Sequence, residues 1–191
     1  MNKGNMTNGI NVTQLNDTLN AIKKTPSIAK CEFRIKNKWI SGANSRSTIK
    51  DFYAAGQEDT VRTKQFTLEA DEPAVLLGTD KAPGAGEYLL QALASCLVTT
   101  LIYHAAAQGI KIESVDTEIK GTVDLQGFLG LTKKVRNGFD NIDVKFRIKG
   151  DNITDEQKRQ LCEMAKNYSP VFDNISNPTR ITVGLEEPVA V

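Results

Sequence analysis

The fold of this chain is decided by residues 86–109, which read GEYLLQALASCLVTTLIYHAAAQG. Apolar residues fall on almost every side of the corresponding helical wheel, namely Leu89, Leu90, Leu93, Leu97, Val98, Leu101 and Ile102. We therefore predict a buried helix over residues 87–108, which Gly109 ends in the left-handed conformation. Polar residues such as Gln91, Ser95 and Thr99 interrupt the run, as is typical of a core helix and not of a membrane span.

The segment that leads into this helix is predicted to be a loop. Residues 71–86 contain two prolines and three glycines, which neither continue a strand nor begin a helix early. The carboxylates of Asp71 and Glu72 lie in this turn-rich segment, so we expect them to be solvated.

Further upstream, the pattern changes to the alternation of a strand. Cys31, Phe33 and Ile35 alternate with charged residues, which predicts a half-buried strand and places Cys31 in the core. Two more strands of a meander are predicted over residues 48–53 and 65–68.

After the long helix we predict a strand broken near Gly121, a second alternating strand, a helix and a last strand. These occupy residues 115–125, 142–149, 154–169 and 179–185. Thr154 followed by Gln157 is a capping box that begins the helix, and Ser169-Pro170 ends it.

This order of elements predicts an α+β fold, in which two antiparallel sheets surround a long buried central helix. Residues 27–191 form a single domain, and residues 1–26 form a helical extension with an amphipathic helix over residues 12–24. Because the central helix is apolar on nearly every side, we expect a second copy of the chain to cover it, as a homodimer.

Composition narrows the range of functions. The 191 residues are 40% apolar and 25% charged, and 24 Lys and Arg balance 23 Asp and Glu to a net charge of +1. A net charge this close to zero does not attract nucleic acid or an anionic membrane, so we expect neither as a partner. No nucleotide-binding glycine motif is present, and we expect no cofactor.

The three cysteines, Cys31, Cys96 and Cys162, have no zinc-ligand spacing, so we expect no metal and reduced thiols. The polar N-terminal stretch lacks the apolar segment of a signal peptide, and we predict a cytoplasmic protein.

Cys96 is the candidate nucleophile, because it lies within the helix behind a glycine-rich loop, where the helix dipole and an arginine could activate it. The alternative is that Cys96 is only a small apolar residue buried in the core. His104 lies about 12 Å along the helix from Cys96 and is expected to be structural.

Two motifs resemble the OsmC/Ohr family of thiol-dependent hydroperoxide reductases. They are the runs over residues 86–97 and 167–171, and the similarity extends from about residue 31 to residue 183. Trp39-Ile40-Ser41-Gly42, Ala70-Asp71-Glu72-Pro73 and Gly127-Phe128-Leu129-Gly130 look like one OsmC-like branch of the family. The resemblance implies an intertwined dimer in which a first cysteine attacks peroxide, a second cysteine resolves it, and an Arg and a Glu polarise the first thiol.

Carried over residue by residue, the resemblance assigns Cys96 as the attacking cysteine. The second cysteine is replaced by Ser169, so the usual internal disulfide cannot form. The family glutamate position is Gly86 here, and Glu87 follows one residue later, where it is expected to cap the helix. We retain Glu87 and Arg46 as candidate catalytic residues beside Cys96, with Arg62 as the other candidate arginine.

These residues suggest two functions. The first is an OsmC-like reductase of small-molecule hydroperoxides, or an oxidative-stress protein, in which Cys96 is recycled by an external thiol reductant. The alternative is a non-catalytic protein that binds an apolar ligand in a pocket at the dimer interface. Cys162 lies about 10 Å along its helix from Ser169, so we predict that it does not form a disulfide with Cys96.

Overall fold

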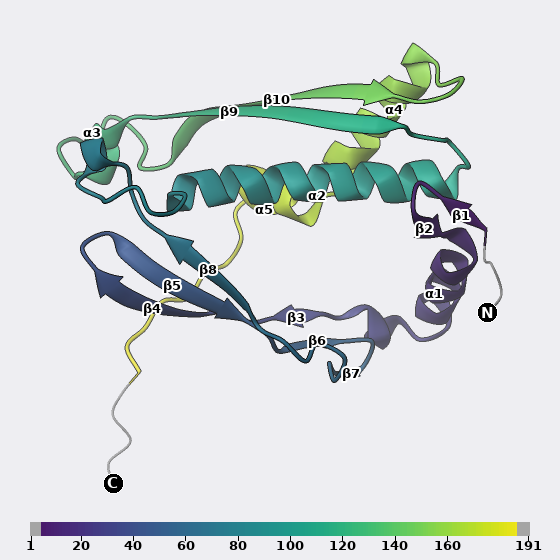
Figure 1. Ribbon diagram of the computed structural model, residues 1–191, viewed down its shortest axis with the longest axis horizontal. Coiled ribbons are helices and arrows are strands. Elements are labelled where there is room, and N and C mark those ends of the chain that lie inside the picture. The colour runs from purple at the N-terminus through teal and green to yellow at the C-terminus, as the bar shows by residue number, and fades with distance from the viewer. Residues whose placement is uncertain (1–4, 187–191) are drawn as a thin grey trace, which may run out of the picture.

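Figure 1 shows the arrangement of the helices and strands in the computed structural model, which describes residues 5–186. Before the central helix come β1 (Met6–Thr7), β2 (Ile10–Asn11), α1 (Val12–Lys24), β3 (Glu32–Phe33), β4 (Lys36–Ser41), β5 (Asn44–Ile49), β6 (Phe52–Ala54), β7 (Gln57–Glu58) and β8 (Phe66–Ala70). The central helix and the elements after it are α2 (Ala85–Ala107), β9 (Ser114–Val123), α3 (Leu125–Phe128), β10 (Phe139–Lys149), α4 (Asp155–Tyr168) and α5 (Pro170–Ser176).

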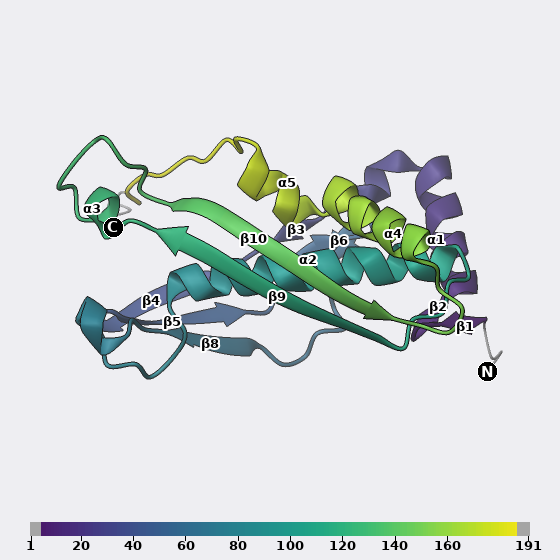
Figure 2. The same cartoon turned by 90° about the horizontal axis from the view of Figure 1, so that it is seen from above.

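The predicted α+β fold with a central helix is confirmed. Helix α2 runs between the β9–β10 hairpin on one side and the β4-β5-β8 sheet on the other (Figure 1). The observed sheets are smaller and more numerous than the two predicted ones, because the upstream strands divide into separate antiparallel sheets, β3-β6-β7 and β4-β5-β8. From above, α4 and α5 lie beside the β9–β10 hairpin (Figure 2), and both contact α2.

Both ends of α2 have a local cause. Gly84 precedes the first turn, where its backbone N–H donates to Glu87 Oε2 at 2.8 Å, as one half of a capping box. Gly109 follows the last turn with φ +70°, a conformation that favours glycine. By length and composition α2 could cross a membrane. It packs against β9, α4 and α5, but only five of its 23 residues are buried within this one chain, fewer than the predicted buried helix requires.

The apolar core lies where α2 meets α4 and the β9–β10 hairpin. Its buried side chains are Leu93, Leu97, Leu101, Ala105, Leu161 and Ala165. The hairpin contributes the inward side of its alternating pattern, which includes Val144 and Phe146. The capping box of α4 is confirmed, because Thr154 Oγ1 accepts from Gln157 N–H at 3.1 Å and Gln157 Oε1 accepts from Thr154 N–H at 2.9 Å.

The predicted strand break at Gly121 is wrong, because β9 runs without interruption through this residue. The glycine instead accommodates the aromatic ring of Phe139 on β10. A Cβ at Gly121 would lie only 2.7 Å from that ring. Close packing between side chain and backbone, and not a bend of the strand, therefore accounts for the glycine.

The alternating stretch around Cys31 differs most from its predicted burial. Only Glu32–Phe33 forms a strand there, and Cys31 is exposed instead of lying in the core. Phe33 is 76% exposed and Ile35 is 64% exposed. Figure 1 shows β3 on the side of the molecule away from the β9–β10 hairpin. The Phe33 ring stacks on the ring of Phe52, with their centres 6.1 Å apart, but most of it remains exposed.

Two other predicted strands also require correction. Residues 48–53 are divided at Lys50 and Asp51 between β5 and β6. Residues 179–185 form no strand, and Val183 within them is 90% exposed. The sequence analysis also missed α5, because Pro170 does not merely end α4 but occupies the first turn of the next helix.

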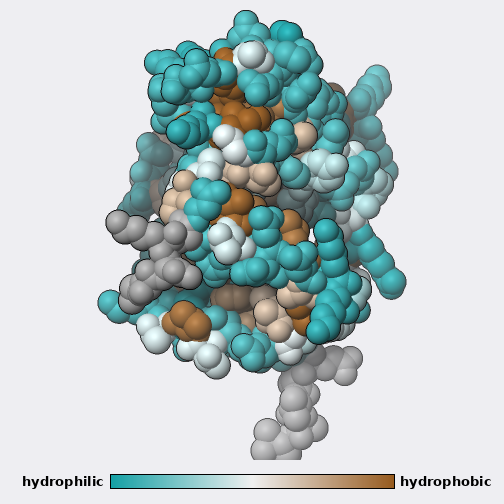
Figure 3. Space-filling model, turned by 90° about the vertical axis from the view of Figure 1, so that its right-hand side faces the viewer, coloured by the Kyte–Doolittle hydropathy of each residue, from teal (hydrophilic) through white to brown (hydrophobic). Residues whose placement is uncertain are grey.

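The N-terminal helix spans the predicted residues 12–24 as α1. The turn between β1 and β2 fixes this segment to the end of α2. The side-chain amide of Asn8 donates to the Ile110 carbonyl at 2.8 Å and accepts from the Ile112 N–H at 2.8 Å. It thus makes the same pair of hydrogen bonds that a backbone amide group of a neighbouring strand would make. Seen from this end (Figure 3), the surface is mainly hydrophilic, with apolar patches between the polar side chains.

Candidate functional site

The thiol of Cys96 contacts the hydroxyl of Ser169. Cys96 lies in the middle of α2, and Ser169 lies at the junction of α4 and α5, 73 residues further along the chain. Ser169 Oγ donates to Cys96 Sγ at 3.1 Å, and Ser169 is 2% exposed. The two motifs therefore meet at one hydrogen bond, between a buried hydroxyl and a half-buried thiol.

The α4–α5 junction determines the direction of the Ser169 hydroxyl. The backbone N–H of Ser169 donates to the Ala165 carbonyl at 3.1 Å, which ends α4. Its Oγ accepts from the Phe172 N–H at 3.1 Å, which begins α5. With one lone pair engaged in this way, the hydroxyl proton is directed to the sulfur. Because an ionised acceptor strengthens such a bond, this arrangement suits a sulfur that reacts as the thiolate.

A cavity of about 1070 Å³ lies along the first two turns of α2, and its lining includes neither Cys96 nor Ser169. Its apolar lining includes Leu89, Leu93, Val123, Leu125, Phe128, Phe139, Ile142, Val144, Phe172 and Ile175. Leu93 lies one helical turn before Cys96, and Phe172 donates its N–H to Ser169. The cavity thus ends at residues that are neighbours of Cys96 and Ser169 in their helices, and it is large enough for a small-molecule ligand.

Glu87 lies at the N-terminus of α2 and caps the helix, as expected from its position. Its carboxylate is held by the Gly84 N–H at 2.8 Å. Nine residues of helix separate Glu87 from Cys96, which corresponds to about 13 Å of rise. Within one chain, Glu87 therefore acts on the helix end and not on the thiol.

The two candidate arginines have partners elsewhere. Arg46 on β5 donates from Nε to Glu69 Oε1 on β8 at 2.5 Å. Arg62 donates to the Lys50 carbonyl at 3.1 Å, with its guanidinium 4.7 Å from the centre of the Phe52 ring. Neither arginine donates to Cys96 within the described part of the chain.

Comparison with known proteins identifies the family of this chain. A family model described as OsmC-like protein matches residues 78–184, which include Cys96, Ser169 and most of the cavity. The chain is a member of the OsmC-like protein family. No curated protein matches it.

Solved structures of other OsmC-like proteins have the same fold at low sequence identity. An OsmC-like protein of Mycoplasma pneumoniae is 16% identical, with a TM-score of 0.58 over 77% of this chain and 89% of its own. A Psychrobacter arcticus protein, assigned to osmotic stress induction and detoxification response, is 15% identical, with a TM-score of 0.55 over 75% and 88%. An OsmC-like protein of unknown function from Vibrio cholerae is 14% identical, with a TM-score of 0.52 over 75% and 92%.

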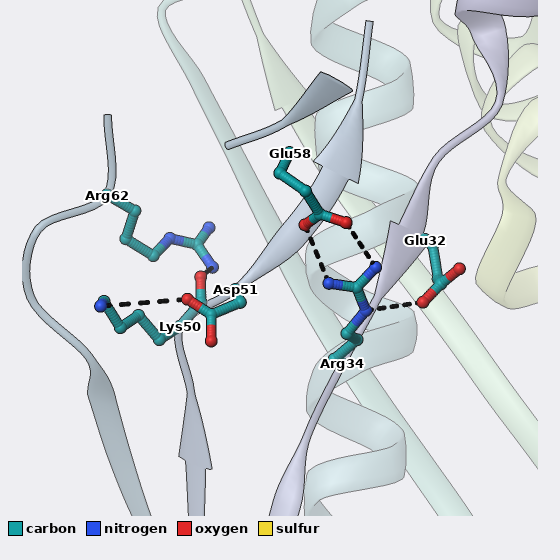
Figure 4. Close-up of polar contacts among 6 residues, drawn as sticks. All are labelled: Glu32, Arg34, Lys50, Asp51, Glu58 and Arg62. Atoms are coloured by element: carbon teal, nitrogen blue, oxygen red, sulfur yellow. Dashed lines mark hydrogen bonds and ion pairs between the residues drawn. The ribbon is translucent and has the colours of Figure 1, made fainter. Parts of the chain in front are cut away.

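A third arginine of this OsmC-like chain, Arg34, forms an ion-pair cluster that the sequence analysis did not single out. Figure 4 shows its guanidinium between two carboxylates. Arg34 donates two bonds of 2.9 Å to Glu58 and one of 2.6 Å to Glu32. The bonds from Arg34 lower the pKa of Glu58, and those carboxylates raise the pKa of Arg34. The cluster joins the segment around β3 to β7.

Cys162 and His104 lie outside the Cys96–Ser169 pair. Cys162 lines a separate cavity of about 340 Å³ with Phe146, and burial, aided by the negative charge of Glu163, raises the pKa of this thiol. His104 stacks on Tyr168 with their ring centres 4.8 Å apart, in keeping with the structural role expected for it.

The carboxylate of Asp71 is buried, which corrects the expectation that it is solvated. Asp71 is 2% exposed and accepts from Thr79 Oγ1 at 2.6 Å, Thr79 N–H at 3.1 Å, Lys81 N–H at 3.2 Å and Glu72 N–H at 2.9 Å. The Thr79 hydroxyl, together with these amides and against the effect of burial, lowers the pKa of Asp71 to about 2. Asp71 thereby holds together the loop that leads into α2.

Among residues 5–186 the OsmC-like chain has no group of three or more His, Cys, Asp or Glu side chains that could hold a metal ion. The groups that the site itself offers are one thiol, one hydroxyl and an apolar cavity.

Proposed function

We propose that this OsmC-like chain reduces organic hydroperoxides with Cys96 as the nucleophile and with an external thiol as the reductant. The observation that carries the proposal is the 3.1 Å contact of Ser169 Oγ with Cys96 Sγ. It brings together the position of the attacking cysteine and the position where the family's second cysteine stands, and an apolar cavity is lined by Leu93 and Phe172, three residues from each of them.

The reaction balances with one hydroperoxide and two thiols. The Cys96 thiolate attacks the terminal peroxide oxygen, the O–O bond breaks, and the alkoxide takes a proton and leaves as the alcohol. Cys96 is then a sulfenic acid. One external thiol displaces water from it to form a mixed disulfide, and a second thiol restores Cys96 and leaves as the oxidised disulfide.

The alternative is a protein that binds an apolar molecule without chemistry. Two observations favour it. Glu87 is engaged in capping α2, and Arg46 is paired with Glu69, so within one chain neither polarises the thiol. A reactive Cys96 distinguishes the two functions, because a binding protein needs only the cavity.

Replacing Cys96 with serine tests the proposed reaction. With cumene hydroperoxide and excess dithiothreitol, we expect Cys96→Ser to lower the turnover of peroxide at least about a hundredfold, because serine cannot be oxidised in this way. Consumption of peroxide is measured together with the alcohol formed. Cys162→Ser is the matched control and should retain the wild-type rate. Equal turnover by the wild-type protein and Cys96→Ser would favour the binding protein.

We also propose that the chain acts as a homodimer. Only five of the 23 residues of α2 are buried, although the helix is apolar on most sides. Phe33 and Trp39 of the upstream strands are 76% and 69% exposed. A second copy that covers these side chains would remove their apolar surface from water, and large exposed apolar side chains that gather on one face are typical of protein–protein interfaces.

The dimer has a direct test in sedimentation equilibrium. At micromolar concentration we expect the mass of two chains for the wild type. Ile35→Lys places a charge within the exposed apolar side of the upstream strands and should shift the equilibrium toward the monomer by at least about tenfold. Circular dichroism checks that the variant is folded. A wild type that is entirely monomeric at these concentrations would contradict the dimer.

A further inference from the structure

The Ser169 hydroxyl is the polar group that the structure places against the sulfur of Cys96. Its Oγ donates to Cys96 Sγ at 3.1 Å, from a residue that is only 2% exposed. Among the residues that the structure describes, no other side chain forms a hydrogen bond with this sulfur. A negative charge on the sulfur therefore has one protein partner within the chain, and that partner is Ser169.

The usual sources of thiolate stabilisation lie away from Cys96. The thiol lies about three turns from the first residue of α2, whereas the effect of the helix dipole falls off within the first turn. His104 lies about two turns further along and stacks on Tyr168. Arg46 and Arg62 donate to other groups of the chain. A stabilised thiolate in this chain therefore depends on a neutral donor.

Charged side chains on the elements that pack on this part of α2 are paired or exposed. On α4, Lys166 lies 3.7 Å from Glu163. On α5, Asp173 Oδ1 accepts from the Asn177 amide at 2.8 Å. The charged residues of β9 and β10 lie on the exposed side of the hairpin, and they are Asp116, Glu118, Lys120, Asp140, Asp143, Lys145, Arg147 and Lys149.

The cap of α5 leaves the Ser169 proton free for the sulfur. Ser169 Oγ accepts from the Phe172 N–H at 3.1 Å, so the cap engages a lone pair of the hydroxyl and not its proton. A hydrogen bond to an ionised acceptor is stronger than one to a neutral acceptor, and the difference corresponds to about fivefold in an equilibrium constant. The hydroxyl therefore favours the thiolate of Cys96 over the thiol.

We propose that Ser169, at the position of the family's resolving cysteine, holds Cys96 as the thiolate by donating a hydrogen bond to its sulfur. Ser169 keeps its proton throughout, and the proton that Cys96 loses passes to water at the half-buried thiol. The serine thus acts before a hydroperoxide arrives, whereas a resolving cysteine acts after the peroxide has reacted. The inference rests on the proposed function in taking Cys96 as the nucleophile, and it adds the group that activates this thiol.

The pH profile of Cys96 alkylation tests this role in the full chain without peroxide. Iodoacetamide is neutral and reacts with the thiolate, and mass spectrometry of the peptide that contains Cys96 gives the rate. We expect Ser169→Ala to raise the midpoint of the profile by about 0.7 pH units, which corresponds to a fivefold loss of thiolate. Because a more basic thiolate is more nucleophilic, this variant should react about twofold more slowly than the wild type below both midpoints and about twofold faster above them. The two profiles therefore cross, which a merely structural effect would not produce.

Two further variants separate the hydroxyl from the fold. Ser169→Gly also removes the hydroxyl but supplies a residue that begins helices nearly as well as serine, and it should give the same shift. Thr100→Val is the matched control, because the Thr100 hydroxyl donates to the Cys96 carbonyl at 2.8 Å and not to the sulfur, and it should leave the profile unchanged. Circular dichroism checks the fold of each variant, and the exposed Cys31, alkylated in the same samples, should keep its wild-type profile.

Several outcomes would overturn the proposal. They are an unchanged midpoint in Ser169→Ala, a shift that Ser169→Gly does not share, and an equal shift in Thr100→Val. A shift to lower pH would also overturn it, because the thiol would then be the donor and Ser169 the acceptor. Crossing profiles in a protein without hydroperoxide turnover would count against the proposed reaction alone. Turnover with coinciding profiles would count against the role of Ser169 alone.

Discussion

Ser169→Cys is expected to give, after peroxide treatment, a protein in which Cys96 forms an internal disulfide with the cysteine introduced at position 169. In the wild type, Ser169 Oγ is already 3.1 Å from Cys96 Sγ, and the sulfurs of a disulfide lie about 2.05 Å apart. The two side-chain atoms therefore need to approach each other by only about 1 Å. The sulfenic acid formed on Cys96 would be attacked by the new thiol, with water as the leaving group. Mass spectrometry after one equivalent of hydroperoxide measures the product.

The wild type should instead retain Cys96 as a sulfenic acid, or as a mixed disulfide when a small thiol is present. Cys162→Ala is the control for both proteins and should change neither product, because Cys162 lines another cavity. The substitution at position 169 weakens the cap of α5, at a cost of about 1 kcal/mol. A stoichiometric Cys96–Cys162 disulfide in the wild type would show that Cys162 is the resolving residue, and the external-thiol mechanism would then be wrong.

Asp71→Asn should destabilise the folded protein strongly, although it replaces only one carboxylate oxygen by an NH₂ group. The carboxylate accepts four hydrogen bonds, three of them at Oδ2. An amide has one oxygen, so its NH₂ group must face buried donors in either orientation. We expect the midpoint of thermal unfolding to fall on the order of 10 °C at pH 7. Asp80→Asn removes the same charge from the same loop and should leave the midpoint nearly unchanged.

The effect of Asp71 should depend on pH in a defined direction. Its pKa in the folded protein is about 2, below the ordinary value of 3.8, so the folded state holds the charged form more strongly than the unfolded chain does. This stabilisation is complete above pH 3.8 and is lost as the pH falls through 2. The unfolding midpoints of the wild type and Asp71→Asn should therefore approach each other over this range. A constant difference would mean that the loop does not depend on the ionised carboxylate.

The parts of the fold that could be predicted from the sequence are those in which one chain buries its own apolar pattern. The apolar run over residues 87–108 and the alternation over residues 142–149 predicted α2 and β10, and apolar side chains of these two elements pack on each other. The same alternation around Cys31 was misleading. It shows which side of a strand is apolar, but not whether anything in the chain covers that side, and Ile35 remains 64% exposed.

The site was predictable only in part, for a related reason. Cys96 and Ser169 were singled out by motifs, and the structure brings them into contact. The burial of Asp71 was not predicted, because its partners Thr79 and Lys81 are spaced irregularly within a loop that has no periodic pattern.

The location of the core has a consequence during protein synthesis. Among the described residues, no buried apolar side chain comes before Leu93, because the core is built from α2 and α4. Ribosomes add about 5–20 residues per second, so the residues before α2 wait on the order of ten seconds for Leu161 and Ala165 of α4, which complete the core. Phe33, Ile35 and Trp39 remain exposed even after the core is complete. A single finished chain therefore still presents apolar residues of the kind that a chaperone for extended apolar segments binds.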